Sequence, residues 1–272
     1  MMRSLWTAAS GMTAQQRNMD TISNNLANVN TTGYKKERME FKSLLYETMQ
    51  SADLDPASQT GRPANLQVGH GVRPAATGRV FTQGNLQSTG YPLDLAIEGD
   101  GFFAVDRGGG DIVYTRDGSL KISPTQNGLE LVTADGFAYL GTDGEPIYLP
   151  VNTLVNDIIV GPDGGITVRD ANGQPADTGY QLDLNQFSNM QGLEAVGGNF
   201  FKATSASGDP IQETGGGVTQ RSALRQGVLE SSNVQVADEM VNMIVTQRAY
   251  ELNSRAISSS DEMLQTANNM KR

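Results

Sequence analysis

One histidine and no cysteine limit the metal-dependent and nucleophilic chemistry available to this 272-residue chain. Without cysteine, neither a thiolate zinc site nor Cys–His catalysis is possible. A Ser–His–Asp triad would have to use His70, and no Gly-x-Ser-x-Gly turn accompanies it. Glycines flank His70 on both sides, which is typical of a solvated loop residue. We therefore predict no catalytic residues, no metal ligands and no cofactor site.

Acidic residues are plentiful, but their spacing matches no common binding site. Residues 161–173 are rich in Asp, Asn and Gly, yet they lack the ligand spacing and final Glu of an EF-hand loop, which favours turns over weak calcium binding. Gly99-Asp100-Gly101 precedes two Phe rather than a helix, which favours a turn over a dinucleotide-binding loop. An alternative function is a β-rich glycan hydrolase that uses two carboxylates, but no pair stands out.

Charge is distributed unevenly along the chain. The formal net charge is −10, and residues 47–224 alone contribute −12. This acidic middle argues against nucleic acid as a partner. The sequence has no run of about 18 apolar residues, so we expect no direct membrane insertion. Gly11, Thr13 and Gln15 interrupt the N-terminal apolar residues and argue against a cleaved signal peptide, so a role outside the cytoplasm needs another export route.

The first region has the periodicity of an amphipathic helix. Apolar side chains, with one glutamine among them, recur at alternating steps of three and four residues. This stripe consists of Leu5, Ala8, Met12, Gln15, Met19, Ile22, Leu26 and Val29. We expect a helix of about 25 residues, with Gly33 as its C-terminal stop after the polar residues 30–32.

A second helix is predicted near the C-terminus. Its looser apolar stripe consists of Val236, Met240, Met243, Ile244, Tyr250, Ile257, Leu264 and Met270. Residues 231–233, two Ser and one Asn, are candidates for the N-cap. Acidic residues 238–239 at the start and basic residues 271–272 at the end suit the helix dipole.

Neither helix can bury its apolar stripe alone, so we expect the two to pair as a discontinuous helical coiled-coil domain over residues 1–46 and 225–272. Both contain weak helix formers, such as Gly11 and the three serines at 258–260, so we expect them to become ordered only on assembly. The residues predicted to form the assembly interface are Leu5, Met12, Met19, Ile22, Leu26, Met240, Met243, Ile244, Tyr250, Ile257 and Leu264.

The middle of the chain has the pattern of short strands. Leu93, Leu95 and Ile97 alternate with more polar residues, and Asp-Gly pairs recur between the apolar runs that follow. We predict an inserted antiparallel β domain over residues 85–210. Residues 47–84 fit neither pattern and are predicted to be an extended arm or loose hairpin, and residues 211–224 a return linker. The fold class is therefore α+β.

Several stretches of the chain resemble the flagellar axial family of rod and hook proteins. The N-terminal run is NMDTISNNLANVNTTGYK, residues 18–35. The C-terminal match includes GVLESSNV, residues 227–234, and QRAYE, residues 247–251. In the middle, AIEGDGFF (96–103) and YTRDGS (114–119) also resemble the family. Together the similarity spans nearly the whole chain.

Within this basal-body rod family, residues 3–6, 44–48 and 69–74 look most like the distal-rod type, with a proximal-rod paralogue as the alternative. The resemblance implies a structural subunit, not an enzyme, that polymerises into a tubular helical filament and transmits torque through the periplasm. It also implies export by the flagellar type III apparatus. The implied partners are further copies of the chain, proximal-rod and hook subunits, and the surrounding ring bushings.

Overall fold

The computed structural model describes residues 2–52, 64–126, 128–151, 153–170, 174–215 and 220–270. The chain forms two compact units. The helical unit consists of Met1–Ala27, Glu37–Gly78 and Gln235–Arg272, and the β unit consists of Asn28–Lys36 and Arg79–Val234. The chain therefore leaves the helical unit twice and returns to it twice.

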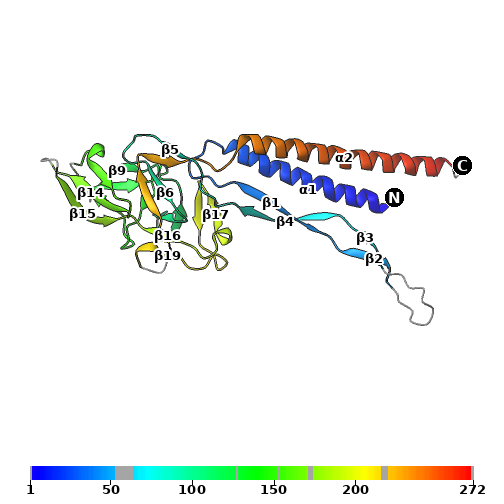
Figure 1. Cartoon of the computed structure of the whole chain (residues 1–272), viewed down its shortest axis with the longest axis horizontal. Helices are drawn as coiled ribbons and strands as arrows, with labels where there is room; N and C mark the ends of the chain where they lie inside the picture. Colours follow the sequence, from blue (N-terminus) through cyan, green and yellow to red (C-terminus); the bar gives the residue numbers. More distant parts are fainter. Residues whose placement is uncertain are drawn as a thin grey trace. The chain divides into compact units, whose positions relative to one another are not determined.

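Both predicted helices are present in the helical unit. Helix α1 (Met2–Ala27) and helix α2 (Val236–Asn269) lie side by side and antiparallel (Figure 1). The Ser4 and Ser260 hydroxyl oxygens are 3.3 Å apart, and the Asn18 amide donates to Thr246 Oγ1 at 3.0 Å. The first contact joins the start of α1 to the C-terminal part of α2, and the second joins the C-terminal half of α1 to the N-terminal half of α2.

The predicted helix ends were partly wrong. Helix α1 stops at Ala27, before Gly33, because Asn28 and Thr31 form a turn in which the Thr31 amide donates to the Asn28 carbonyl at 3.2 Å. Gly33 instead takes a left-handed φ of 66° inside the β unit. Helix α2 has Gln235 at its N-cap, not a residue of 231–233. Those three polar residues make hydrogen bonds within the β unit instead.

A two-stranded arm completes the helical unit, and α1 contacts its first strand (Figure 1). Strand β1 (Glu37–Ser43) pairs with β4 (Val72–Arg79), and β2 (Tyr46–Gln50) pairs with β3 (Leu66–Gly69). The strands begin at Glu37, inside the range 1–46 predicted to belong to the helical coiled-coil domain, and in β1 only Glu37 and Met39 are half-buried. Residues 53–63 of the predicted arm lie outside the described residues.

The β unit is antiparallel throughout its described strand pairs, which confirms the α+β fold class. The largest sheet contains β7 (Phe102–Asp106), β8 (Ile112–Thr115), β9 (Lys121–Thr125), β10 (Gly128–Val132), β11 (Ala138–Tyr139), β12 (Tyr148–Leu149), β16 (Leu184–Gln186), β17 (Glu194–Gly197), β18 (Phe200–Lys202) and β19 (Ile211–Gln212). A smaller sheet contains β13 (Ile158–Val160), β14 (Gly165–Arg169) and β15 (Pro175–Gln181).

Two further strand pairs hold the ends of the β unit together. Strand β5 (Leu86–Ser88) pairs with β21 (Val228–Glu230), and β6 (Leu95–Glu98) pairs with β20 (Ala223–Gln226). Three short 3₁₀ helices occur in the connections: η1 (Val155–Asp157), η2 (Met190–Gly192) and η3 (Glu213–Gly215). The range predicted as a return linker, 211–224, therefore contains β19, η3 and the start of β20. That prediction was wrong for its described residues, because Glu213 is buried and bonds Ser222.

The Asp-Gly pairs serve two different purposes. Asp135-Gly136 and Asp163-Gly164 lie between paired strands, and both glycines have positive φ, as a tight hairpin turn requires. Gly118 is different, because it follows β8 and its backbone pairs with Leu95 instead of turning a hairpin. The hairpin interpretation was therefore wrong for Asp117-Gly118, where the glycine permits close backbone approach.

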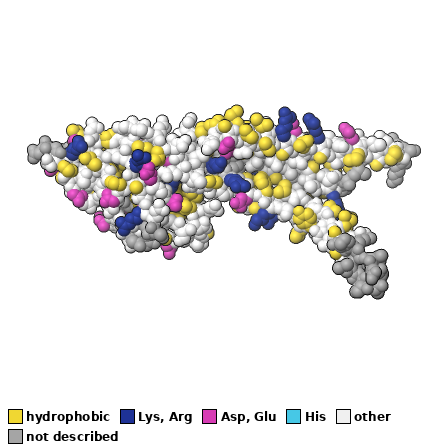
Figure 2. All heavy atoms as spheres, viewed as in Figure 1, with side chains coloured by type: hydrophobic (Ala, Val, Ile, Leu, Met, Phe, Trp, Pro, Cys, Tyr) yellow, Lys and Arg dark blue, Asp and Glu magenta, His cyan; other side chains and the backbone are white. Residues whose placement is uncertain are grey.

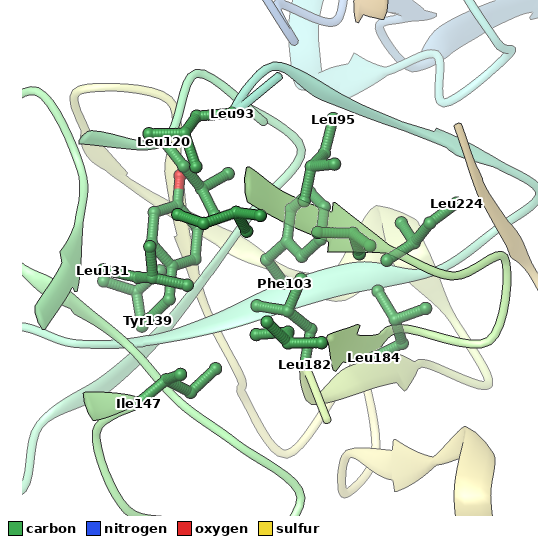
Figure 3. Close-up of a cluster of buried hydrophobic side chains, with 14 of the residues drawn as sticks. Leu93, Leu95, Phe103, Leu120, Leu131, Tyr139, Ile147, Leu182, Leu184 and Leu224 are labelled. Carbon is green, nitrogen blue, oxygen red and sulfur yellow. The ribbon is translucent and has the colours of Figure 1, made fainter. Parts of the chain in front are cut away.

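The core of the β unit consists of two buried apolar clusters. Leucine, valine and isoleucine side chains from both sheets point toward one another around Phe103 and Tyr139 (Figure 3). In the second cluster, the Phe102 ring makes edge-to-face contacts with Phe81, Phe187 and Phe201, with ring centroids 5.7 to 5.9 Å apart. Because such contacts need defined ring orientations, this cluster fixes segment 79–82 against the sheet.

We predict that Gly118→Ala lowers the free energy of unfolding of the full chain by about 2 kcal/mol or more. A Cβ on Gly118 would lie 1.7 Å from the Leu95 carbonyl oxygen, so the backbone would have to move. Urea unfolding followed by circular dichroism measures the change. Gly215→Ala is the matched control, because its Cβ would have no atom within 4 Å; equal effects of the two variants would contradict the close-approach explanation.

Candidate assembly surface and the buried ion cluster

The predicted interface residues of α1 lie at or near the contact between elements of the helical unit. Ile22 is buried, with 5% of its surface exposed. Leu5, Met12, Met19 and Leu26 are half-buried. The strand arm also covers part of α1, since the Asn25 side chain exchanges two hydrogen bonds of 2.8 Å with the Glu37 backbone. Little of the predicted α1 stripe is therefore open to solvent.

The predicted residues of α2 divide into two groups. Met243, Ile257 and Leu264 are half-buried. Met240, Ile244 and Tyr250 are exposed, with 52%, 55% and 39% of their surfaces accessible. The structure thus does not bring all eleven predicted residues into one contact. The division follows from polar residues such as Thr246, which is 3% exposed and occupies the α1-facing side of α2.

A broad apolar face of α2 remains exposed, and we call it the α2 outer face. Its large members, between 43% and 80% exposed, are Val236, Met240, Val241, Ile244, Val245, Leu252, Met263 and Met270. Figure 2 shows hydrophobic side chains at the surface of the helices, beside exposed Lys and Arg. Sequence reasoning missed Val241, Val245, Leu252 and Met263, although Val241 and Val245 are one turn apart, a spacing that indicates a shared face. An exposed apolar area of this kind marks an interaction site.

The arm exposes apolar side chains too. Phe41, Leu45, Tyr46, Met49 and Leu66 are between 38% and 87% exposed. An isolated two-stranded ribbon is marginally stable in water, and exposed apolar side chains do not add to its stability.

Polar contacts tie the arm to the first turn of α1. Arg3 Nη2 lies 2.7 Å from Glu47 Oε2, and His70 Nε2 lies 3.6 Å from the same oxygen. All three side chains are nearly half exposed, so His70 is a surface residue and these contacts add little stability.

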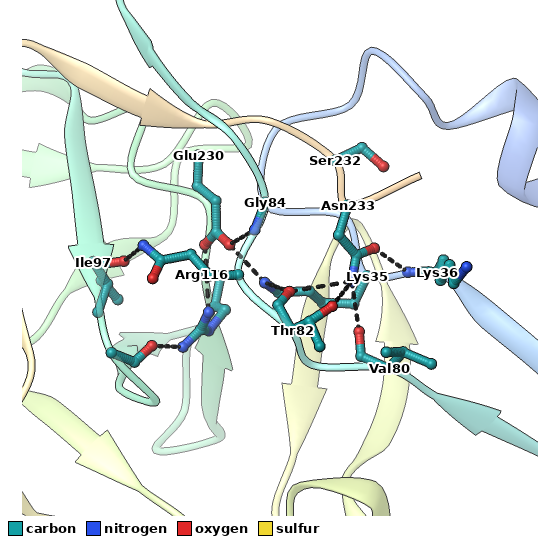
Figure 4. A network of polar contacts seen from close by, with 12 residues as sticks. Lys35, Lys36, Val80, Thr82, Gly84, Ile97, Arg116, Glu230, Ser232 and Asn233 are labelled. Carbon is teal, nitrogen blue, oxygen red and sulfur yellow. Dashed lines mark hydrogen bonds and ion pairs between the residues drawn. The ribbon is translucent and has the colours of Figure 1, made fainter. Parts of the chain in front are cut away.

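The β unit encloses a cluster of three charged side chains, Lys35, Arg116 and Glu230, here called the buried ion cluster (Figure 4). Lys35 Nζ donates to Glu230 Oε1 at 2.6 Å, and Arg116 Nη1 lies 3.5 Å from Glu230 Oε2. No more than 1% of any of the three side chains is exposed. Glu230 therefore pairs with two cations that are shielded from water.

Neighbouring groups satisfy most of the cluster, and only Arg116 Nε has no hydrogen-bond partner among the described residues. The Gly84 amide donates to Glu230 Oε1 at 2.8 Å, and Lys35 also donates to the Thr82 carbonyl at 2.9 Å. Arg116 donates to the Gly99 carbonyl, and its guanidinium carbon lies 5.1 Å from the centroid of the Phe102 ring. The cluster thus joins five separate stretches of the β unit, which contain Lys35, Thr82, Gly99, Arg116 and Glu230.

Burial controls the ionisation of this cluster. Burial, together with the Arg116 charge, lowers the pKa of Lys35 to about 8, against the opposing effect of Glu230. Burial also lowers the pKa of Arg116, and the carboxylates of Glu230 and Asp100 oppose that shift. Sequence reasoning missed all three residues, because nothing in a local pattern distinguishes a buried charge from a surface one.

Asn233 forms a second junction beside the cluster (Figure 4). Its side-chain amide donates to the Val80 carbonyl at 2.7 Å, and its side-chain oxygen accepts from the Lys36 amide at 2.8 Å. The segments that lead into and out of the β unit are therefore bound to the same strand-like stretch, residues 79–84.

The described part of the chain contains no group of three or more His, Cys, Asp or Glu placed to hold a metal ion. Neither of its two helices is long and apolar enough to cross a membrane. What the described residues offer is an exposed apolar face, an apolar arm and a buried charge cluster, which are suited to assembly and not to bond-making chemistry.

Three family models match this sequence in chain order. Residues 5–35 match the flagella basal body rod protein model, residues 96–168 the D1 domain of flagellar hook protein FlgE/F/G, and residues 225–270 the C-terminal region of the flagellar basal body rod FlgEFG proteins. Each matched region supplies one member of the buried ion cluster, respectively Lys35, Arg116 and Glu230.

Full-length relatives agree with the family models. The flagellar basal-body rod protein FlgG of Borreliella burgdorferi is 50% identical over 273 residues, which covers 100% of both chains. The FlgG protein of Bacillus subtilis is 38% identical over 272 residues, again with 100% of both chains covered. The flagellar hook-basal body complex protein FlhP of the same organism is 32% identical over 277 residues and 100% of both chains.

The chain therefore belongs to the flagellar basal-body rod protein family, whose members are structural and not enzymatic. Within that family it is a structural subunit of the distal rod, located in the flagellar basal body. The resemblance found in the sequence is thereby confirmed.

We predict that Lys35 makes the full chain more stable as the pH rises from 8 to 10. The pKa of Lys35 is about 8 in the folded chain and 10.5 in the unfolded chain, so the folded chain loses this proton first. Stability rises with pH wherever the unfolded state binds more protons, by up to about 3 kcal/mol here. The quantity to measure is the difference in unfolding free energy between the natural chain and Lys35→Met across this range. Lys42→Met, at an exposed position, is the control, and a pH-independent difference for Lys35→Met would refute the assignment.

Proposed function

We propose that copies of this chain polymerise into a tubular helical filament through the α2 outer face. The single observation that carries the proposal is the exposure of eight large apolar side chains on one helix. Fully burying each Met, Ile, Leu or Val would contribute about 1.5–3 kcal/mol, so a few of them suffice for a stable contact. A contact between different surfaces of successive copies generates an open helix when its rotation does not close a ring, and that is the geometry proposed here.

In the proposed filament the two helices pair as a coiled coil and form an inner layer, with the β units outside. Half-buried Met243, Ile257 and Leu264 belong to the pairing within one chain, and exposed Met240, Ile244 and Tyr250 to contacts between copies. The weak helix formers in both helices support a further proposal, that neighbouring copies order these ends during assembly. Such a filament would transmit torque across the periplasm.

The proposed partners follow from family membership. Proximal-rod and hook subunits would meet the two ends of the filament, the ring bushings would surround its β units, and the flagellar type III apparatus would export the chain. The net charge of −12 over residues 47–224 keeps that stretch soluble and opposes non-specific binding to nucleic acid.

Introducing charge on the α2 outer face should block polymerisation without unfolding the chain. For Met240→Asp with Ile244→Asp we expect a change of under about 1 kcal/mol in the unfolding free energy, because both side chains are exposed. The amount of assembled rod isolated from cells should fall at least about tenfold, with loss of swimming. The control carries two new charges at exposed polar positions of the same helix, Asn242→Asp with Gln247→Asp. Normal rods from the apolar-face variant would rule out this interface.

The arm is proposed to limit bending of the filament by packing its apolar side chains on neighbouring copies. Deleting residues 47–70 should make rods several-fold more flexible, measured as persistence length in electron micrographs. Tyr46→Ser, Met49→Ser and Leu66→Ser together should do the same, because they remove the exposed apolar contacts and keep the arm length. The polar pair Glu40→Ser and Lys42→Ser serves as the control. Unaltered stiffness after the deletion would reject the proposal.

A further inference from the structure

The contact between α1 and α2 is lined at regular intervals by polar or small side chains. We call the three cross-helix pairs the polar ladder: Ser4 with Ser260, Gly11 with Asn253, and Asn18 with Thr246. The α1 positions rise in steps of seven while the α2 positions fall in steps of seven. The rungs therefore recur once per heptad on facing sides of two antiparallel helices.

The same series continues toward the β unit in sequence. One further step of seven reaches Asn25 on α1 and Glu239 on α2, which are 1% and 3% exposed. Between the rungs lie apolar side chains, such as buried Ala8 and Ile22 on α1. The seam thus alternates apolar layers, which give affinity, with polar layers, which constrain geometry.

The central rung depends on a difference in size. A Cβ placed on Gly11 would lie 2.9 Å from Nδ2 and 3.1 Å from Cγ of Asn253, so the Asn253 side chain fills the space that the missing Cβ leaves. Glycine in the middle of a helix is destabilising relative to alanine, and this space-filling contact is a physical reason for placing it there. In size, Gly11 and Asn253 therefore fit each other across the contact, whereas two glycines or two asparagines at this rung would not.

The rung formed by Asn18 and Thr246 depends on hydrogen bonding. Asn18 Nδ2 donates to Thr246 Oγ1 at 3.0 Å, and the Thr246 hydroxyl itself donates to the Asn242 carbonyl at 2.8 Å. Thr246 is 3% exposed, so water has little access to replace this contact. A pairing of α1 with another α1 would take the hydroxyl acceptor away from Asn18, and an unmade hydrogen bond in this partly buried contact is unfavourable.

We propose that the polar ladder makes α1 and α2 specific for each other, so that pairing between like helices of different copies is disfavoured. Two α2 helices would place Asn253 against a residue that has a Cβ, and two α1 helices would leave the Gly11 space unfilled. Apolar stripes alone do not distinguish such pairings, because apolar contacts are non-directional. The ladder needs only the helical pair of one chain and does not depend on the filament contacts proposed above.

The test exchanges the members of the central rung in the full-length chain. Gly11→Asn crowds the seam, Asn253→Gly empties it, and the two changes together restore one glycine and one asparagine across the contact. Because the chain has no native cysteine, Ser4→Cys with Ser260→Cys reports the intramolecular pair by disulfide formation. Ser260→Cys alone reports α2–α2 pairing as a covalent dimer.

Each single exchange should lower the yield of the intramolecular disulfide about tenfold. Gly11→Asn should also raise the yield of the covalent dimer that forms through Ser260→Cys. The double exchange should return both yields to within about threefold of the starting values. Thr13→Asn, at an exposed α1 position, is the control for asparagine in this helix and should change neither yield.

Additive losses in the double exchange would overturn the proposal, as would single exchanges without effect. Circular dichroism covers the case in which Gly11→Asn loses its helices: recovery of helicity in the double exchange supports the ladder, and failure to recover overturns it. If Met240→Asp with Ile244→Asp leaves polymerisation normal while the double exchange still recovers, only the proposed filament contact is rejected.

Discussion

The carboxylate of Glu230 contacts two cations inside the β unit. These contacts hold together segments of the unit that are distant in the sequence. Lys35 belongs to the segment that first enters this unit, and Glu230 to the segment that last leaves it. Breaking a buried ion pair on one side leaves an uncompensated charge, which costs about 3–5 kcal/mol. The segments that enter and leave the β unit are therefore brought together by a contact that tolerates few substitutions, although they are distant in the sequence.

The helical unit works by a different balance. The contact between its two helices is partly polar, and the helices contain weak helix formers. Many of its large apolar residues lie on the α2 outer face instead of in this contact. An isolated chain built this way keeps a large area of apolar surface exposed to water. The β unit, in contrast, buries its leucines and aromatic rings in two clusters of its own. The β unit therefore has an apolar core of its own, whereas the helical unit leaves apolar surface exposed for contacts with other molecules.

Membership of a structural, non-enzymatic family is consistent with that division. A structural subunit needs surfaces that match neighbours over a large area, and it needs no perturbed nucleophile or metal ligand. The ionisable groups with shifted pKa values, such as Lys35 and Arg116, are held by packing inside the β unit and hold segments together. Their shifts are consequences of burial and not signs of catalysis.

Local patterns in the sequence determined the two helices, the antiparallel β class and the membership of the rod family. Periodicity identified the α1 and α2 stripes because a helix repeats every 3.6 residues whatever surrounds it. Only the tertiary structure decided that Gly33 ends no helix, that residues 211–224 carry strands, and that Met240 and Ile244 face outward while Met243 faces inward. It alone joined Lys35, Arg116 and Glu230, because burial and charge pairing depend on residues distant in sequence, which no local window contains.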